Sequence, residues 1–327
     1  MKILLIRFSS IGDIVLTSPI IRCVKQQIPN AEVHYLTKSA FQSLVHHNPY
    51  IDRVHLLEES LNETVKQLDL EKFDLIIDLH KNIRTRFIRK KLGVKYLSFD
   101  KLNFKKWLFT SFQINKLPKI HLVDRYFHAV SSLGITNDGQ GLDSFISGQT
   151  SIDMFALPME SFTVFAIGGT YSTKRLPNER IASIIDKLKE PVILIGGLTD
   201  QENSQAIMAL VKNNEIIDLC GKLSLEQSAL CIAKSSHVIC HDSGMMHIAS
   251  AYSKPLSVVW GNTHPDFGMY PYGYSKNGNL FQYQIDLKCR PCSKLGYDSC
   301  PKKHFKCMKN HNVDEIVKNW HSVDAMQ

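Results

Sequence analysis

The sequence predicts an α/β protein with two doubly wound domains, each built on a parallel sheet. The chain of 327 residues is long for one core and suits two domains of about 150 residues each. Short apolar runs alternate with amphipathic stretches along most of its length, which is the pattern of βαβ units. Runs such as residues 75–77 and 192–195 are continuously apolar, as expected for parallel strands that are buried on both faces.

The first half of the chain is predicted to alternate strands with helices. Pro29, Pro49 and Gly93 fall where helices are expected to stop. The predicted strands are residues 3–8, 33–37, 54–57, 75–79 and 96–99, and the predicted helices are residues 18–27, 40–46, 63–68, 83–92 and 123–133.

A polar, glycine-rich stretch at residues 137–149 has no periodicity and is the predicted linker, after which the alternation restarts. We therefore predict one domain over residues 1–150 and a second over residues 151–312. A closing segment, residues 313–327, contains a helix at 313–320 that is a candidate to pack back on the first domain. In the second half the predicted strands are residues 163–167, 192–195, 216–219, 238–240 and 256–259, and the predicted helices are residues 178–188, 201–211, 225–233 and 245–252.

The composition is that of a globular enzyme, with 44% apolar and 21% charged residues. The N-terminal apolar run is too short for a signal-peptide core, and no other stretch approaches the roughly 18 apolar residues of a membrane span. We expect a cytoplasmic protein whose eight cysteines are reduced unless they bind a metal.

Positive charge is concentrated in residues 81–125, which hold 13 Lys and Arg residues against Asp100 and Asp124, in a chain of net charge +8. One basic surface favours an anionic partner: a phosphorylated substrate, an acidic membrane or nucleic acid. A solvated helix face explains the charge run equally well.

The first candidate site follows the first strand, where residues 7–15 read RFSSIGDIV and open a helix. Ligands of open α/β sheets bind beyond the carboxyl ends of the strands, so this loop is expected at the ligand-binding edge. Gly12 would let the backbone approach a ligand closely, and Asp13 is the candidate catalytic residue. Alternatively, Asp13 complements the helix dipole and Ser9 or Ser10 caps the helix. The loop is not G-x-G-x-x-G, which disfavours a dinucleotide.

The second candidate site follows the first strand of the second domain, where residues 168–177 read GGTYSTKRLP. Glycine backbone N–H groups, three hydroxyls and two cations at a helix start favour phosphate binding. An ordinary polar loop is the alternative, and the P-loop pattern is absent. The residues singled out here are Gly169, Thr170, Ser172, Thr173 and Lys174.

The third candidate site is residues 241–251, HDSGMMHIASA, again at a strand exit. Ser243 and Gly244 would present N–H groups to a diphosphate, and His247 would point back toward the same site. Asp242 could orient the loop or accept hydrogen bonds from a sugar or ribose hydroxyl. A serine hydrolase is excluded because the G-x-S-x-G elbow is missing and these three residues cannot form a triad at this spacing.

The C-terminal cysteines follow the pattern C-x2-C-x7-C-x6-C, with His304 nearby. One C-x2-C pair is typical of zinc sites, but the other two cysteines are too far apart to form a second such pair. Reduced thiols and a structural zinc site at Cys289, Cys292, Cys300 and Cys307 are the two interpretations, with no catalytic metal expected.

These segments resemble glycosyltransferase family 9, the bacterial lipopolysaccharide heptosyltransferases, over nearly the whole chain. The resemblance is carried by SSIGDIVLTSP at residues 9–19, TKRLP at 173–177 and DSGMMHIA at 242–249, the last being the most specific. The cysteine segment is similar to the Cys-x-Pro-Cys tail of many members. The chain departs from the family at Met245 and Ser250, and at residues 261–266, which read GNTHPD where Pro-Thr-x-Pro is commoner.

The resemblance implies the GT-B fold, with the acceptor in the N-terminal domain and a nucleotide sugar in the C-terminal one, facing a central cleft. It implies an inverting, metal-independent transfer of heptose from ADP-heptose to a phosphorylated inner-core acceptor, with no cofactor. Asp13 matches the general base and Lys174 the diphosphate-binding lysine. Ser243, Gly244 and His247 match the donor loop, together with Asp242. Either Asp200 or Glu202 falls where the family holds the nucleoside.

On the acceptor side, Ser10 and Gly12 are expected beside the acceptor, and Lys81, Arg84 and Arg86 against its phosphates. The interleaved aromatics Phe104, Trp107, Phe109 and Phe112 would face the membrane that bears the acceptor. We expect a monomer, peripheral on the cytoplasmic face of the inner membrane, that does not bind nucleic acid.

Three rival hypotheses remain. A related transferase could use another donor such as a UDP-hexosamine, and a nucleotide-sugar epimerase would need the same diphosphate loops but no acceptor. A nucleic-acid-binding module could use the basic segment and a zinc knuckle, but it leaves three strand-exit loops unexplained.

Overall fold

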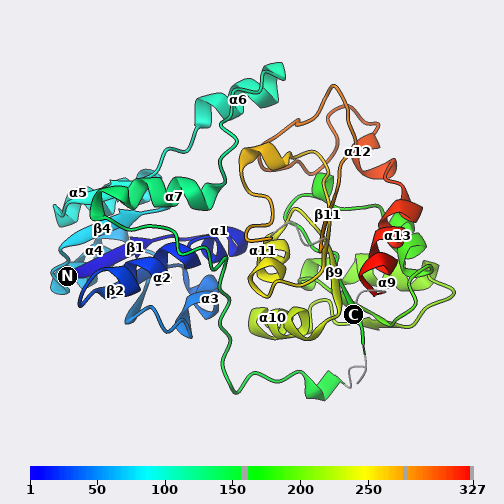
Figure 1. Cartoon of the computed structure of the whole chain (residues 1–327), viewed down its shortest axis with the longest axis horizontal. Helices are drawn as coiled ribbons and strands as arrows, with labels where there is room; N and C mark the ends of the chain where they lie inside the picture. Colours follow the sequence, from blue (N-terminus) through cyan, green and yellow to red (C-terminus); the bar gives the residue numbers. More distant parts are fainter. Residues whose placement is uncertain (156–160, 275–278, 325–327) are drawn as a thin grey trace. The chain divides into compact units, whose positions relative to one another are not determined.

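The computed structural model describes residues 1–155, 161–274 and 279–324, and it confirms the predicted α/β class with two parallel-sheet units (Figure 1). Unit 1 comprises Met1–Lys101 and Ile120–Gly148, and unit 2 comprises Leu102–Lys119 and Gln149–Gln327. The excursion at Leu102–Lys119 thus groups with the second half of the chain, although sequence order places it within the first. In the described part of the chain, every helix is too short or too polar to cross a membrane.

Unit 1 is built on a five-stranded parallel sheet in the order β3-β2-β1-β4-β5, and each strand lies where an apolar run predicts it. Apolar residues on one face of the sheet form a core with Leu68 of α4 and Ile88 of α5. The strands are β1 (Lys2–Ile6), β2 (Glu32–Thr37), β3 (Arg53–Leu56), β4 (Leu75–Asp78) and β5 (Tyr96–Ser98). The helices are α1 (Ile11–Val15), α2 (Ser18–Gln27), α3 (Ser43–His46), α4 (Leu61–Leu70), α5 (Ile83–Leu92) and α7 (Leu122–Val130), with 3₁₀ turns at Ser39–Phe41 and Ser131–Leu133.

A buried arginine holds much of the glycine-rich stretch against α2. The Arg22 side chain is 1% exposed, and its Nε and Nη2 atoms donate to the Asp138 carboxylate over 2.7 and 2.9 Å. Its Nη1 atom pairs with Asp143, and Nη2 also reaches the Gly141 carbonyl. A buried guanidinium requires such partners. Ion pairs rather than an apolar face therefore order much of the predicted linker, and the boundary between the two units falls near its end, after Gly148.

Unit 2 is built on a six-stranded parallel sheet in the order β11-β10-β9-β6-β7-β8. Five strands lie where they are predicted, whereas the edge strand β11 and the helices α6 and α12 have no counterpart among the predicted elements. The strands are β6 (Thr163–Ala166), β7 (Val192–Ile195), β8 (Ile216–Asp218), β9 (His237–His241), β10 (Leu256–Val259) and β11 (Leu280–Tyr283). The helices are α6 (Asn103–Phe112), α8 (Asn178–Ile185), α9 (Gln201–Leu210), α10 (Leu225–Lys234), α11 (Gly244–Ala251), α12 (Lys306–Lys309) and α13 (Val313–Asp324), with 3₁₀ turns at Asp153–Phe155, Ser172–Lys174, Leu198–Asp200 and Pro265–Phe267.

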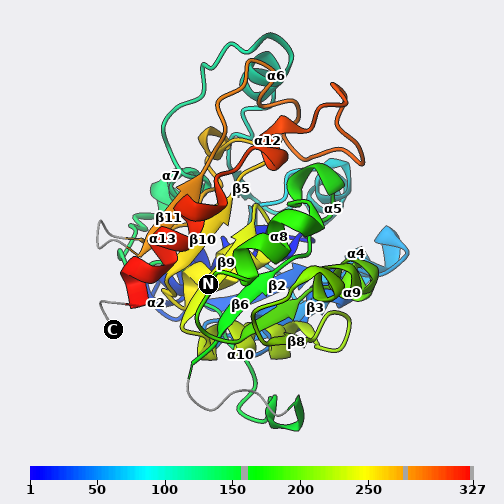
Figure 2. The same cartoon turned by 90° about the vertical axis from the view of Figure 1, so that its right-hand side faces the viewer.

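The closing helix α13 packs into the core of unit 2. Val313, Ile316, Val317 and Trp320 recur at helical spacing, and they join the buried cluster that α8 forms on the sheet. The indole N–H of Trp320 donates to the hydroxyl of Thr163 over 2.8 Å. Figure 2 shows α13 beside α8. The expected packing of this helix on the first domain is therefore corrected: its apolar stripe is buried in unit 2.

Both sheets reverse their strand order beside the first strand of the unit. In unit 1 the chain steps outward from β1 to β2 and β3, then returns to β4 on the other side. In unit 2 it steps from β6 to β7 and β8, then returns to β9. Ligands of open α/β sheets bind in the crevice beyond the carboxyl ends of such strands. The loops after β1 and β4, and those after β6 and β9, are thus the ones that the topology favours for binding.

The basic segment does not form one continuous patch on one unit. Of its 13 Lys and Arg residues, Lys105, Lys106, Lys116 and Lys119 belong to unit 2 and the others to unit 1. Arg125 is buried, and burial lowers its pKa. Arg89 pairs with Asp78 over 3.2 Å and stacks on Tyr96. The chain therefore divides these charges between two cores, and one basic surface formed by all of them stays a prediction.

Candidate active-site loops

Asp13 lies in the first turn of α1, directly beyond β1, as predicted. Its Oδ1 atom is 2.5 Å from Nη2 of Arg7, and its Oδ2 atom accepts hydrogen bonds from the hydroxyl and the N–H of Ser10 over 2.8 and 3.2 Å. The side chain keeps 19% of its surface exposed. Arg7 and Ser10 therefore fix the position of the Asp13 carboxylate, which solvent or a small substrate can still reach.

Arg7 ties this loop to the rest of unit 1. Its Nη1 atom donates to the Leu79 carbonyl beyond β4 over 2.5 Å, and its Nε atom donates to the Ser9 carbonyl over 2.9 Å. Burial alone would raise the pKa of Asp13, but the Arg7 guanidinium and the Ser10 hydrogen bonds outweigh it and lower that pKa. Asp13 is thus ionised at neutral pH and able to accept a proton.

The neighbouring loop after β4 is organised by Asp78, which sequence reasoning did not single out. The buried Asp78 carboxylate accepts the N–H groups of His80 and Lys81 over 3.0 and 2.7 Å. Burial, with Arg7 as the second cause, lowers the pKa of His80 to about 3, so its imidazole is neutral. The sequence signal that could have identified Asp78 is a carboxylate at the end of a continuously apolar strand.

The predicted acceptor-binding cations differ in their availability. The Lys81 ammonium donates to the Phe99 carbonyl over 2.7 Å, which commits one of its three protons. Arg84 and Arg86 are exposed on α5, and the Arg84 guanidinium lies 5.4 Å from the centre of the Phe8 ring. Arg84 therefore lies next to the Asp13 loop, with its charge open to solvent.

In unit 2 the loops after β6 and β9 meet at an ion pair. Lys174 Nζ lies 2.7 Å from Asp242 Oδ2, and the Thr263 hydroxyl donates to the same oxygen over 2.7 Å. Burial alone would raise the pKa of Asp242, but Lys174 and Thr263 hold it below its usual value. One oxygen of Asp242 is therefore committed to Lys174 and Thr263, and the choice between its two predicted roles stays a prediction.

The glycine-rich loop after β6 contains a 3₁₀ turn before the predicted helix begins. It enters a single 3₁₀ turn, Ser172–Lys174, and α8 begins only at Asn178, so no α-helix starts within residues 169–173. Pro177 occupies the N-cap position, and α8 begins at the residue where the sequence predicts it. Thr170 and Ser172 are exposed, whereas the Thr173 hydroxyl is committed to the backbone of Tyr297.

The two candidates for the nucleoside position also differ. Asp200 is buried, its Oδ1 atom 2.9 Å from Arg175 and its Oδ2 atom accepting the Gly197 N–H over 2.8 Å. It fits only beside glycine, since a Cβ on Gly168 would lie 2.7 Å from Oδ2. Glu202, in the first turn of α9, is exposed. Asp200 therefore holds the loops together, and Glu202 is available to a ligand.

At the start of α11 the backbone is free to meet an anion. Ser243 occupies the N-cap position, and Gly244 is the first helical residue. The buried Ser243 hydroxyl finds no hydrogen-bond partner among the described residues. His247 is buried one turn further on, and its charged form would lower the pKa of Asp242. The loop thus offers N–H groups and a hydroxyl beside the Lys174–Asp242 pair.

The C-terminal cysteines are all free thiols. Cys289 Sγ lies 3.7 Å from His304 Nε2, and the Cys292 thiol donates to the Cys289 carbonyl over 2.9 Å. Burial raises the pKa of Cys292 to about 12 and that of Cys307 to about 11. Within the described residues, three side chains close enough to share a metal are found in unit 1 and not among these cysteines. A structural zinc site here stays a prediction.

Comparisons with known proteins point to one family of glycosyltransferases. A family model described as glycosyltransferase family 9 (heptosyltransferase) matches residues 62–297. The chain is 24% identical over 325 residues to lipooligosaccharide heptosyltransferase 2 of Campylobacter jejuni, covering 97% of each chain. Its structure is similar to that of a family 9 glycosyl transferase from Veillonella parvula, with a TM-score of 0.79, 22% identity and coverage of 100% and 98%. It is also similar to the ADP-heptose LPS heptosyltransferase II of E. coli, with a TM-score of 0.77, 18% identity and coverage of 100% and 99%.

Proposed function

The chain belongs to glycosyltransferase family 9, and we propose that it transfers a heptose from ADP-heptose to a phosphorylated lipopolysaccharide inner-core acceptor. Its fold is GT-B, as the resemblance implied. The observation that carries the proposal is the Lys174 ammonium, held 2.7 Å from Asp242 between two glycine-containing loops where the strand order reverses. A cation and backbone N–H groups at such a point suit a diphosphate.

The proposed reaction inverts the configuration at the sugar's C1 atom. Inversion needs a base that takes the proton of the acceptor hydroxyl as its oxygen attacks C1 from the face opposite the leaving diphosphate. Asp13 fits this role because it is ionised and partly exposed. Arg84, with Ser10 and Gly12 in the same loop region, would receive the acceptor and its phosphates.

The leaving diphosphate gains negative charge in the transition state and requires stabilisation. Lys174, the N–H groups at Ser243 and Gly244, and the Ser243 hydroxyl would supply it, so that a divalent ion is not needed. Glu202 would contact the nucleoside, because Asp200 is committed to Arg175 and Gly197. These assignments support a nucleotide diphosphate sugar as the donor, and the similarity to an ADP-heptose heptosyltransferase favours ADP-heptose.

We also propose that a monomer acts at the cytoplasmic face of the inner membrane through α6. Phe104, Trp107 and Phe112 are half or more exposed on this helix, beside Lys105 and Lys106. Aromatic side chains next to lysines suit an anionic lipid surface. Phe109, predicted to face the membrane with them, is instead buried against Phe267.

A ligand screen tests the donor assignment. ADP and ADP-heptose are expected to raise the melting temperature more than UDP- or GDP-sugars, since a ligand at 100 times its Kd adds about 2.7 kcal/mol to the free energy of unfolding. Transfer to a deacylated inner-core acceptor is then measured by mass spectrometry, with and without EDTA. Stabilisation by a UDP-hexosamine would support the alternative transferase, and turnover of the donor without acceptor would support an epimerase. If no nucleotide stabilises the protein, the donor site is assigned wrongly.

The acid limb of the pH profile is expected to lie at higher pH in a Ser10→Ala variant. Asp13 accepts a proton only when ionised, and the Ser10 hydroxyl stabilises that form, so removing it raises the pKa of Asp13. In the wild type the lowered pKa of Asp13 keeps its carboxylate ionised at pH values below the ordinary pKa of aspartate. Measuring kcat/KM against pH checks this, with Ser9→Ala as the control because Ser9 contacts Arg7 through its backbone carbonyl. Coincident acid limbs in Ser10→Ala and wild type would contradict Asp13 as the titrating base.

A further inference from the structure

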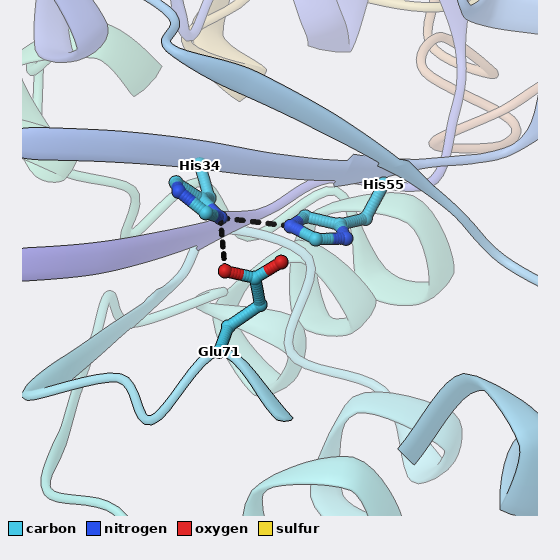
Figure 3. A group of neighbouring side chains, drawn as sticks. All are labelled: His34, His55 and Glu71. Carbon is cyan, nitrogen blue, oxygen red and sulfur yellow. Dashed lines mark hydrogen bonds and ion pairs between the residues drawn. The ribbon is translucent and has the colours of Figure 1, made fainter. Parts of the chain in front are cut away.

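Two histidines and a glutamate converge on one face of the sheet of unit 1, away from the loops described above. His34 lies on β2, His55 on the neighbouring strand β3, and Glu71 directly after α4 (Figure 3). His34 Nδ1 is 2.8 Å from His55 Nε2 and 4.0 Å from Glu71 Oε2, and the three candidate ligand atoms lie within 4.8 Å of one another. We propose that His34, His55 and Glu71 bind one divalent transition-metal ion, with Zn²⁺ as the best match.

The spacing suits a small ion with nitrogen and oxygen ligands. Tetrahedral Zn²⁺ with bonds of about 2.0–2.1 Å places its ligand atoms about 3.3 Å apart. The observed 2.8 and 4.0 Å lie on either side of that value and the third separation is within 4.8 Å, so shifts of about 1 Å would complete the site. Two imidazoles and a carboxylate are a familiar zinc ligand set, with water as the fourth ligand.

The hydrogen bonds of the two imidazoles also suit metal binding at these atoms. His34 Nε2 lies 2.9 Å from Glu32 Oε1, a carboxylate that accepts the ring N–H and leaves the lone pair of Nδ1 facing the group. In that arrangement His55 Nε2 donates to His34 Nδ1 over 2.8 Å, so both nitrogens face the proposed ion. The proton shared between His34 and His55 moves to Nδ1 of His55 when the metal binds, so no net proton is released.

The surroundings hold the two imidazoles in place. His34 is 1% exposed and His55 9% exposed, and both rings meet the edge or face of Phe73 at nearly right angles. The β2–β3 pairing fixes their backbones in register. Preformed ligands of this kind bind a metal without paying the ordering cost of a flexible loop.

Two cationic side chains beside Glu71 compete with the metal ion and limit the affinity of the site for it. Lys2 and Arg53 pair with the two oxygens of Glu71 over 3.1 and 2.5 Å, and Lys2 also pairs with Glu32. Each carboxylate oxygen has a second lone pair, and metal-binding carboxylates are commonly hydrogen-bonded as well. The side chains of Lys2 and Arg53 are 25% and 63% exposed, so both can turn toward water. The ion would then link β2, β3 and the end of α4.

This site is independent of the transfer reaction. Lys2 begins β1, whereas the Asp13 loop follows the other end of that strand. Glu71 likewise precedes β4, and the Asp78 loop follows it. The ion is therefore a stabiliser of unit 1, and its loss would lower thermal stability without removing a group that touches substrate.

The test uses the full chain, stripped with a chelator and titrated with Zn²⁺ or Co²⁺ alone. One ion per chain is expected by calorimetry, with a rise in melting temperature. His55→Gln and Glu71→Gln should each abolish the rise, and Glu32→Gln should weaken binding by about 10–100-fold through the orientation of His34. His46→Gln, on the exposed end of α3, is the matched control and should bind as the wild type does.

Cobalt separates this site from the cysteines. Binding at His34, His55 and Glu71 gives ligand-field bands without a thiolate charge-transfer band. The proposal is overturned if the stripped wild type gains no stability from either ion, if only the thiolate band appears, or if both His55→Gln and Glu71→Gln bind as the wild type does. If His55→Gln fails to fold, the wild-type titration and Glu71→Gln still decide the matter.

Discussion

Replacing Asp13 by asparagine is expected to lower kcat for heptose transfer by about 10²–10⁴-fold, the usual contribution of a positioned general base. Asparagine keeps the size of the side chain but cannot take the proton of the acceptor hydroxyl. Binding of ADP should be unchanged, because the proposed donor loops belong to unit 2. Single-turnover transfer and the ADP-induced rise in melting temperature, measured on the same preparation, check both halves of this expectation.

A variant of Arg7 is the control for Asp13→Asn. Replacing Asp13 also leaves the buried Arg7 guanidinium without its carboxylate partner. Arg7→Met removes the cation and keeps the base, so transfer should persist with an acid limb at higher pH, since Arg7 is the chief cause that lowers the pKa of Asp13. If Arg7→Met lowers kcat as much as Asp13→Asn does, then Asp13 acts by holding Arg7 in place. Near-normal turnover of Asp13→Asn would remove it as the base.

Strands and site loops were predictable because their signals are local. A continuously apolar run such as residues 192–195 identifies a strand buried on both faces without reference to any other part of the chain. The residue after such a strand is then placed at the ligand-binding edge by the topology of parallel sheets. Asp13, Lys174 and Ser243 were found in this way, and the structure sets all three where the strand order reverses.

The remaining features depend on pairs of residues that are distant in sequence. Arg22 orders the supposed linker through Asp138, 116 residues further on, and no periodicity encodes that pair. The choice between Asp200 and Glu202 depends on Arg175, which takes the first and leaves the second exposed. The edge strand β11 is only partly buried and lacks the apolar run of a central strand. Side-chain pairing, which sequence pattern does not reveal, decided the first two cases.

The histidine cluster of unit 1 could not be predicted for the same reason, because its residues are distant in sequence. His34 and His55 lie two register positions apart on neighbouring strands that pair only after folding. Glu71 approaches them from the end of α4. Metal motifs recognisable from sequence have ligands a few residues apart, as the cysteine segment does. Spacings of 21 and 16 residues carry no such signal, and only the register of β2 with β3 brings the ligands together.

Replacing Lys174 by methionine is expected to lower kcat by about 10²–10³-fold, which corresponds to roughly 3–4 kcal/mol in the barrier. The side chain keeps its length but no longer offers a charge to the leaving diphosphate. The loss should appear mainly in kcat, because charge builds up on the diphosphate as the bond to C1 breaks. Lys174→Arg keeps the charge and should recover part of the rate. Steady-state kinetics with varied donor concentration separates kcat from KM.

Lys174 also neutralises Asp242, so its removal alone would not distinguish a catalytic charge from a structural one. The double variant Lys174→Met/Asp242→Asn resolves this, because asparagine needs no counter-ion and can still accept the Thr263 hydrogen bond. If Lys174 stabilises the leaving group, the double variant regains thermal stability but not turnover. If Lys174 serves only to neutralise Asp242, turnover returns together with stability, and the metal-independent mechanism loses its principal cation. The cycle formed by the wild type, the two single variants and the double variant therefore measures how much of the 2.7 Å ion pair serves the fold and how much serves the reaction.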